Sequence, residues 1–285
     1  MFKQDYTTCL QRYLLPYIGG KCLIAPRFIH PEIPTNIKTY VEPFGGMGWS
    51  LLKLDLEKFQ SLETIVYNDQ NPLNVNLFLC AKKYNVFAEL LILNKPECGD
   101  RETFLEYRKE IFSPNFNHRL DGNNPDYETA FKYVYIMNHT YNGYNPERAS
   151  FCHKEPGQHS KFNSLINKLR NNKMQSHLDK LSVIAHGDYK EIINEFDSKD
   201  TFIYLDPPYL NREHFYSLND FNVKSHYELA TKLHGVQGRF ALSYYYFDQL
   251  LDWYPATKYR WIYKDVHKPS ANNGSTGREY LIMNY

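Results

Sequence analysis

The sequence predicts an α/β fold in which a doubly wound, mostly parallel sheet carries an inserted, mainly helical domain. Three observations lead to this prediction. Short apolar runs alternate with helical segments, several of these runs end in glycine or polar residues, and one long polar stretch interrupts the alternation. Such alternation is typical of buried parallel strands joined by helices. With 285 residues, the chain can form one large domain with an insertion.

The predicted elements follow one another along the chain. Four strands are expected at residues 39–44, 64–67, 181–185 and 201–205, and three more at 239–244, 258–263 and 279–284. Apolar residues from Trp49 to Leu56 predict a helix after the first strand, and the sequence from Pro72 onward predicts another after the second. The stretch from Asn85 to Lys180 is polar, rich in Asn and Tyr, and helical where it has a period, so it is the expected insertion.

Composition excludes several classes of protein. No apolar run approaches the length of a membrane span, and the N-terminus lacks the pattern of a secretion signal, so we expect a cytoplasmic protein. The five cysteines form no CxxC pair, which argues against a disulfide framework and a cysteine zinc site. Cys152, His153 and His159 lie close in sequence, but their polar neighbours favour a solvated loop over a metal site.

Charge is balanced overall and uneven locally. The formal net charge is +1, yet residues 147–180 hold seven Lys or Arg and three Asp or Glu. This excess is compatible with a surface that faces phosphate groups, and equally with a solvated helix face.

Two features predict a site for a nucleoside cofactor. Glycines at 45, 46 and 48 follow the first strand, where they permit a tight turn and a close approach of the backbone to a ligand. Asp69 ends the second strand, where an acidic side chain typically accepts hydrogen bonds from ribose hydroxyls. No GKS or GKT follows the glycines, so a P-loop is disfavoured. These features leave the identity of the cofactor open.

The segment Asp206-Pro207-Pro208-Tyr209 is the most specific feature. Two prolines in series hold the backbone extended and donate no hydrogen bonds, which fixes a carboxylate, a carbonyl and an aromatic ring near one another. Carboxylate and carbonyl can accept both hydrogens of a planar amine while the ring stacks on its base. The alternative is a structural turn with a packing tyrosine.

These motifs together resemble the Dam-like family of adenine-specific DNA methyltransferases, in which a recognition domain separates the cofactor motif from the catalytic motif. The matching segments are Tyr17-Ile18-Gly19-Gly20-Lys21 (with Tyr for the family's Trp), 42–48, 69–72, Asp206–Tyr209, 138–144 with 160–163, 239–244 and 277–282. Between Gly143 and Phe162 the sequence departs from the family's hairpin, so the recognised DNA sequence is not predicted.

The resemblance implies an enzyme that transfers a methyl group from S-adenosylmethionine to the N6 amine of a flipped adenine in double-stranded DNA. Such an enzyme needs no metal, and a monomer is possible. It implies a catalytic domain at 1–84 and 181–285 and a DNA target-recognition domain at 85–180. The implied catalytic residues are Asp206, Pro207, Pro208 and Tyr209. The implied cofactor contacts are Tyr17, Lys21, Glu42, Phe44, Gly45, Gly46, Gly48, Asp69, Asp188 and Asp206. The implied DNA contacts are Asn138, Asn142, Tyr144, Arg148, Lys161 and Asn163.

Three alternatives remain at this point. Enzymes that methylate the amine of cytosine share the geometry but more often carry Ser in place of Asp206. Those that modify RNA or a protein glutamine usually carry Asn there. A methyltransferase-like DNA-binding protein without activity is the third alternative, and the intact Asp206 argues against it.

Overall fold

A single mixed sheet organises the molecule. The computed structural model describes residues 13–17, 19–21, 24–118, 120, 124–141, 145–154, 160–216, 218, 220–267 and 276–285. Within them, the strands are β1 (Thr39–Glu42), β2 (Thr64–Asp69), β3 (Val183–His186), β4 (Thr201–Leu205), β5 (Arg239–Tyr245), β6 (Arg260–His267) and β7 (Thr276–Met283). Their order across the sheet is β3-β2-β1-β4-β5-β7-β6. The predicted fold class is therefore confirmed, and each predicted strand overlaps an observed one.

The strand directions determine where a ligand can bind. Strands β1 to β5 run parallel, whereas β7 is antiparallel to both β5 and β6. The order reverses between β1 and β4, and in open α/β sheets ligands bind at the carboxyl ends of the strands at such a point. The predicted glycine loop follows β1 and the Asp206–Tyr209 segment follows β4, so both motifs lie at this position.

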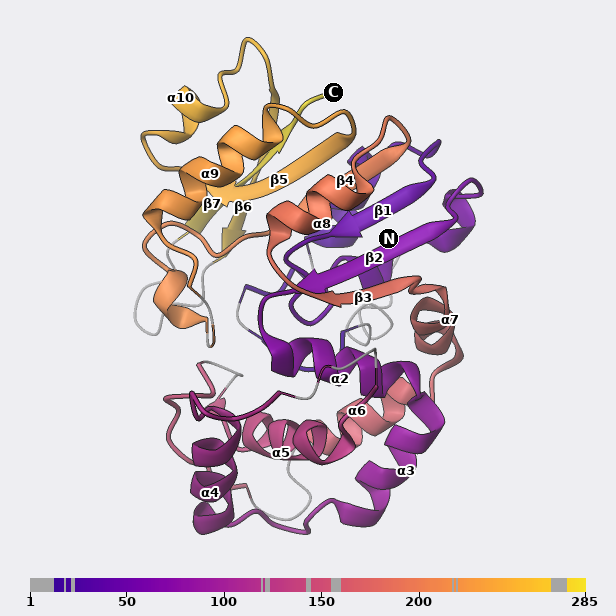
Figure 1. Cartoon of the computed structure of the whole chain (residues 1–285), viewed down its shortest axis with the longest axis vertical. Helices are drawn as coiled ribbons and strands as arrows, with labels where there is room; N and C mark the ends of the chain where they lie inside the picture. Colours follow the sequence, from indigo (N-terminus) through magenta and orange to yellow (C-terminus); the bar gives the residue numbers. More distant parts are fainter. Residues whose placement is uncertain are drawn as a thin grey trace, which may run out of the picture.

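Helices cover both faces of the sheet (Figure 1). Successive side chains of β1 point to opposite faces of the sheet. Val41 packs in the core under α8 (Tyr189–Phe196) and α9 (Val223–Leu233), whereas Tyr40 packs in the core on the opposite face. On that opposite face, α2 (Pro72–Lys82) contacts β2 and β3.

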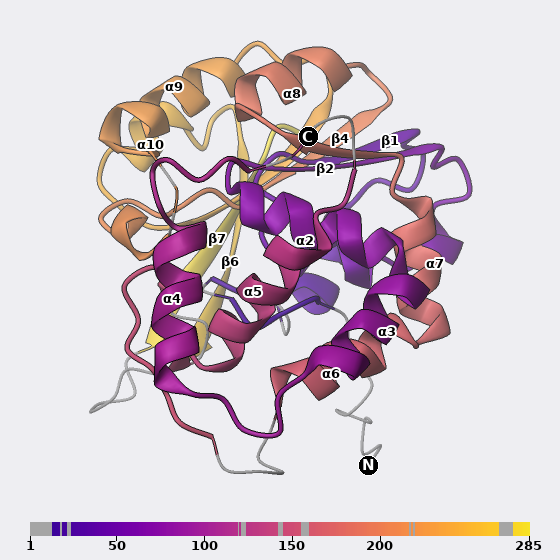
Figure 2. The ribbon, with the colours of Figure 1, turned by 60° about the horizontal axis from the view of Figure 1, so that its bottom comes forward.

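The chain between β2 and β3 is helical, as predicted. Beyond α2 it forms α3 (Tyr84–Asn94), α4 (Arg101–Ile111), α5 (Tyr127–Asn138), α6 (Lys161–Leu169) and α7 (Asn172–Lys180). Figure 2 shows these helices gathered around α2 on one side of the sheet. Side-chain caps explain where several begin: Asp100, Asp126 and Ser160 accept hydrogen bonds from the first-turn backbone of α4, α5 and α6.

The helical region and the sheet share one hydrophobic core. Phe87 of α3, Phe104 of α4 and Tyr133 of α5 are fully buried in the same cluster as Tyr40 of β1 and Tyr67 of β2. The hydroxyl of Tyr133 donates to the buried side chain of Asn74 in α2 (3.0 Å), so the insertion is packed as a continuation of the sheet's core.

The helix predicted from Trp49 to Leu56 is wrong. The chain there forms two 3₁₀ turns, Leu51–Lys53 and Leu56–Lys58. Leu51, Leu52 and Leu54 are all buried, and Leu54 has an extended backbone (φ −51°, ψ 136°). Neighbouring leucines that are both buried do not fit a single helical stripe, so packing overrides the apparent helical period.

The remaining described elements are short. They are a π-helical turn at Ala25–Ile29, 3₁₀ turns at His30–Glu32 and Glu213–Phe215, and the helix α10 (Leu250–Trp253). Among the described helices, none has the length and apolar character that would be needed to cross a membrane.

Candidate active site

An open pocket lies at the carboxyl ends of β1, β2 and β4. It encloses about 720 Å³, including the open space at its mouth. Nine of the residues predicted from sequence line it: Tyr17, Lys21, Glu42, Phe44, Gly45, Gly46, Asp69, Asp206 and Pro208. Four motifs that are separated in sequence therefore meet at one edge of the sheet.

The glycine loop forms one wall of the pocket because larger residues do not fit there. A Cβ atom on Gly45 would lie 2.3 Å from the ring of Tyr67, and Gly46 has a φ of +50°, which L side chains rarely adopt. Gly48 lies outside the pocket; its φ of +70° and its contacts with Leu52 and Phe78 give it a packing role.

Asp69 joins this loop to the start of α2. Its carboxylate accepts hydrogen bonds from the backbone N–H of Gly46 (2.7 Å), the backbone N–H of Asn71 (2.7 Å) and the side-chain amide of Asn74 (3.4 Å). Removal from solvent raises the pKa of Asp69, and these three hydrogen bonds oppose that rise. A carboxylate has about four acceptor positions, so one remains for a ligand.

Lys21 connects the N-terminal segment to the end of β4. Its side chain is 5% exposed, and its Nζ lies 2.9 Å from Oδ1 of Asp206 and 3.4 Å from Oε1 of Glu279. It also donates to the carbonyl of Gly19 (3.2 Å). Burial alone would lower the pKa of Lys21, but the two carboxylates raise it above its usual value, so the amine is charged.

The Asp206–Tyr209 segment forms the wall beside Lys21. Burial raises the pKa of Asp206, and the charge of Lys21 opposes that rise. Pro208 lines the pocket, whereas Pro207 and Tyr209 lie buried behind it. The ring of Tyr209 packs edge-on against Tyr245, with a centroid distance of 4.6 Å, and the ammonium of Lys21 lies 4.8 Å from its centre.

Sequence reasoning missed Glu279. This residue of β7 accepts a hydrogen bond from the hydroxyl of Tyr209 and lies in the same cluster as Lys21 and Asp206. The available signal was its position: Glu279 shares a strand face with Leu281 and Met283, both buried, and a charged residue at a buried position needs a partner.

Glu42 belongs to a buried chain of hydrogen bonds that leaves the pocket. The hydroxyl of Tyr40 donates to Glu42 (2.6 Å) and lies 3.2 Å from the hydroxyl of Ser50, which in turn lies 3.1 Å from Nε2 of His30. Burial raises the pKa of Glu42 to about 8, although the bond from Tyr40 opposes this. Burial also lowers the pKa of His30 to about 4.

Asp188 does not line the main pocket. It caps α8 by accepting a hydrogen bond from the backbone N–H of Lys190 (2.8 Å), and it lines a neighbouring hollow. The two cavities share Phe44 and Gln70 as lining residues, so they are adjacent along the carboxyl ends of the strands.

The predicted DNA contacts that the structure describes have different surroundings. Asn138 and Lys161 are bonded to each other through the side-chain oxygen of Asn138 and the backbone N–H of Lys161 (2.8 Å). The ammonium of Lys161 donates to the carbonyls of Met137 and Thr140 at the end of α5, and burial lowers its pKa to about 8. Asn163 is exposed and accepts from Lys95, and Asn142 and Tyr144 lie outside the described residues.

Among the predicted DNA contacts that the structure describes, Arg148 has neighbours in common with the pocket. It is exposed and lines a hollow together with Tyr216 and Leu218, which also line the main pocket. Lys168, in contrast, is part of the basic stretch but not of a solvated face: it is 5% exposed and donates to the carbonyl of Leu14 (3.2 Å).

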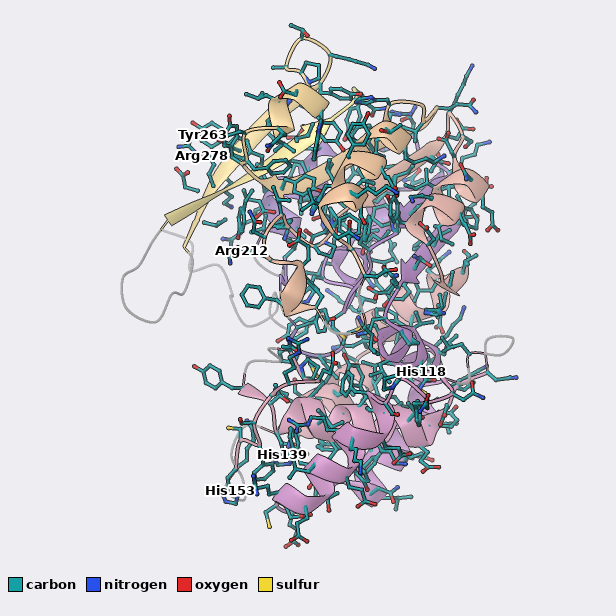
Figure 3. The ribbon with its side chains drawn as sticks, turned by 60° about the vertical axis from the view of Figure 1, so that its left-hand side comes forward. His118, His139, His153, Arg212, Tyr263 and Arg278 are labelled. Atoms are coloured by element: carbon teal, nitrogen blue, oxygen red, sulfur yellow. The ribbon has the colours of Figure 1, made fainter. Side chains whose placement is uncertain are left out.

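The structure gives no metal cluster in the part of the chain that it describes. No group of three or more His, Cys, Asp or Glu residues there could hold an ion. His139 and His153 lie near each other in the helical region (Figure 3), where His139 is 3.2 Å from the carbonyl of Cys152. His159 lies outside the described residues.

The chain is similar to known methyltransferases. The chain is 29% identical over 232 residues to the Type II methyltransferase M.MjaIII of Methanocaldococcus jannaschii, covering 76% of this chain and 77% of that protein. Two solved structures of the rRNA methyltransferase aviRa from Streptomyces viridochromogenes resemble it with TM-scores of 0.34 and 0.31 and identities of 10% and 14%. Each covers 87% of this chain and 77% of the other.

The family match is the most extensive of these comparisons. The sequence pattern of the D12 class N6 adenine-specific DNA methyltransferases matches residues 17–271. The match includes the glycine loop, Asp69 and the Asp206–Tyr209 segment, so the predicted family and activity are confirmed over cytosine, RNA and inactive alternatives. The chain therefore belongs to the D12 class N6 adenine-specific DNA methyltransferase family and is an enzyme that methylates adenine in DNA.

Proposed function

We propose that the methyl donor is S-adenosylmethionine, that it binds in the pocket beside Asp206, and that the acceptor is an adenine flipped out of double-stranded DNA. One observation carries this proposal. Lys21 holds one oxygen of Asp206 at 2.9 Å, in a pocket whose walls also contain the glycine loop and Asp69. Groups that suit a nucleoside and groups that suit an amine thus border one cavity.

The charges of the pocket suit a cationic donor. Among its described lining residues, Glu42, Asp69 and Asp206 are acidic and Lys21 is the basic partner. Opposite charge in a desolvated pocket stabilises a bound cation. S-adenosylmethionine supplies an electrophilic methyl group on a positively charged sulfur. Burial raises the pKa of Asp206 although Lys21 is beside it, so a second positive charge in the pocket would further stabilise the ionised carboxylate.

The shape of the pocket suits the nucleoside part of the donor. We assign the remaining acceptor position of Asp69 to a ribose hydroxyl, with the backbone at Gly45 and Gly46 close to the ligand. The adjoining hollow, which contains Phe44 and Asp188, is the proposed place of the donor's base. Tyr17 lines the pocket beside Gly46 as an aromatic wall.

Asp206 and Pro207 are the proposed acceptors for the target amine. Lys21 contacts Oδ1 of Asp206, so we assign the other oxygen to one N–H of the amine and the carbonyl of Pro207 to the second. Accepting both hydrogens directs the nitrogen lone pair toward the methyl group. As nitrogen gains the methyl group it loses one proton, which Asp206 accepts as general base. The ring of Tyr209 is the proposed stacking surface, which offsets part of the cost of flipping the base.

The helical region is the proposed target-recognition domain. We keep the predicted division, with 85–180 as that domain and 1–84 and 181–285 as the catalytic domain. Arg148 lines a hollow beside the pocket, which supports a DNA-facing role for this part of the helical region. On the other side, Arg278 lies 4.2 Å from the ring of Tyr263, and Arg212 follows the Asp206–Tyr209 segment (Figure 3). Because the substrate is DNA, we also propose a cytoplasmic enzyme that acts as a monomer.

Methylation with an isotopically labelled donor tests the proposal. Purified protein is incubated with S-adenosylmethionine that carries a deuterated methyl group and with duplex DNA, single-stranded DNA or RNA of the same sequence. Nucleosides are then separated and weighed by mass spectrometry. We expect label in N6-methyldeoxyadenosine from the duplex. Label confined to cytosine, or to RNA, would exclude the proposed substrate, and Asp206→Asn serves as the inactive control.

A further inference from the structure

A buried carboxylate outside the predicted site connects the two groups proposed to hold the target adenine. Glu279 is 1% exposed, and its Oε1 accepts a hydrogen bond from the hydroxyl of Tyr209. The same oxygen lies 3.4 Å from Nζ of Lys21, which lies 2.9 Å from Oδ1 of Asp206. One atom of Glu279 therefore contacts both the stacking residue and the lysine that holds the general base.

We propose that Glu279 is a positioning residue for methyl transfer, which keeps Tyr209 and Asp206 in a fixed relative geometry through Lys21. The proposal rests on the function proposed above. Glu279 is not among the residues that line the pocket, so it acts through its neighbours and does not touch the donor there.

A packing role alone does not account for a charge at this position. The neighbours of Glu279 on the same strand face, Leu281 and Met283, are fully buried apolar residues. Removing a carboxylate from water is costly unless it is paired and hydrogen-bonded, and an apolar residue of similar size would be at least as stabilising. The charge at Glu279 is explained if it orients Lys21 and the hydroxyl of Tyr209.

The geometry indicates what is lost without Glu279. The hydroxyl of Tyr209 fixes the ring at its outer end, while Tyr245 supports its side. Lys21 is shared between two carboxylates, so it stays charged and stays against Oδ1 of Asp206. Without Glu279 the ring loses its hydrogen bond to this carboxylate, and the lysine loses one of its two carboxylate partners. A displacement of about 1 Å can cost about 100-fold in rate.

A double-mutant cycle tests the proposal. Glu279→Gln, Tyr209→Phe and the double variant are compared with the wild type for kcat, the KM of S-adenosylmethionine, and thermal unfolding. We expect each single variant to lower kcat by about 10- to 100-fold, because a reacting group displaced by about 1 Å has an effect of this size. The KM of the donor should stay within about two-fold of the wild-type value. The double variant should be no slower than the slower single variant, because Gln replaces the charged acceptor of this hydrogen bond and Phe removes its donor.

A second readout separates positioning from general structural support. A DNA duplex with 2-aminopurine at the target adenine becomes fluorescent when that base leaves the stack. Glu279→Gln should reduce this fluorescence while DNA affinity is retained. Glu32→Gln is the matched control, because Glu32 pairs with Arg260 at 2.7 Å and does not line the pocket.

Each outcome decides the matter. Unchanged kcat in Glu279→Gln, or single effects that multiply in the double variant, would overturn the proposal. Parallel losses of kcat, donor affinity and melting temperature would also overturn it, since they would indicate structural support only. If Glu279→Gln does not fold, Tyr209→Phe removes the same contact and its kcat and fluorescence decide. A wild-type protein that does not methylate duplex DNA would instead contradict the proposed function.

Discussion

The carboxylate of Asp69 accepts a hydrogen bond from the backbone N–H of Gly46, at 2.7 Å and across 23 positions of sequence. The acid at the end of β2 thereby fixes the glycine loop after β1. Together with its bonds to Asn71 and Asn74, this leaves about one acceptor position for a ribose hydroxyl. Asp69 thus has a structural role beside its proposed role in ligand binding, and variants must separate the two.

Asp69→Ala should weaken binding of S-adenosylmethionine by about 10- to 150-fold, the equivalent of one hydrogen bond to a charged group of about 1.5–3 kcal/mol. Calorimetric titration gives the dissociation constant. Thermal unfolding shows how much the variant destabilises the protein by releasing the glycine loop. Asp55→Ala is the control, because Asp55 pairs with Lys58 outside the pocket. An unchanged dissociation constant would leave Asp69 with its loop-holding role alone.

Binding of the donor should release a proton from Glu42. The pKa of Glu42 is raised to about 8, so it is mostly protonated at pH 7 in the free protein, and a bound cation favours its ionised form. Affinity should therefore rise as the pH increases from 7 toward 8 and level off above it. Calorimetry in buffers of different ionisation enthalpy measures the released proton. A binding enthalpy that does not depend on the buffer would contradict this linkage.

Glu42→Gln should affect folding and binding in opposite directions. A carboxyl whose pKa rises from 4.5 in the unfolded chain to about 8 on folding makes the folded state less stable as the pH rises through that window. The amide mimics the protonated form, so the variant should lose this pH dependence of stability and be at least as stable as wild type at pH 8. It should also bind the donor more weakly. Thermal unfolding across pH and titration calorimetry check the two effects.

Asp206→Asn should lower turnover by at least about 100-fold, because it removes a general base, whose contribution is typically 10²–10⁴-fold. Binding of DNA should stay within a few-fold of wild type, since Asp206 lies at the wall of the pocket and faces Lys21. Initial rates and gel-shift titrations give the two quantities. Asp200→Asn, an exposed position six residues upstream, is the matched control. Retention of most activity in Asp206→Asn would refute the assignment of this carboxylate.

Arg148→Gln should weaken binding to all DNA sequences alike and reduce the salt slope by about one, as expected for a contact with one phosphate. The position of Arg148 beside Tyr216 and Leu218 supports this choice. Lys173→Gln is the comparison, since Lys173 lines a separate hollow with Leu54 and Asp55. Affinity is measured across a salt series for both variants. If Lys173→Gln changes the salt slope and Arg148→Gln does not, DNA lies along the surface that carries Lys173 and not beside Arg148.

The sheet and most of the pocket could be predicted from sequence because both depend on local signals. Apolar runs that end in glycine or acid indicate strands and their ligand-binding ends, and Asp69 and Asp206 lie where such runs end. The stretch from Trp49 to Leu56 shows the limit of the method. Its leucines have a helical spacing, but Leu51, Leu52 and Leu54 are all buried, and the chain forms 3₁₀ turns.

Residues whose roles depend on distant partners could not be assigned in this way. Lys168 has the sequence context of a solvated lysine, yet it donates to a carbonyl 154 positions away. Glu279 is separated from Tyr209 by 70 positions, and the sheet order alone brings the two together. Charge counting along the chain also misses that the ammonium of Lys161 is engaged by carbonyl groups.

The core that the sheet shares with the helices between β2 and β3 limits how the specificity of this enzyme can be re-engineered. Phe87, Phe104 and Tyr133 pack in one cluster with Tyr40 and Tyr67, so the helical region and the sheet share one interior. If only some of the helices that are proposed to recognise DNA were replaced by those of a relative, cavities would open beneath β1 and β2. The whole segment from α2 to α7 and its apolar contacts would have to be exchanged together. New target sequences are better sought by diversifying exposed positions such as Arg148 and Asn163.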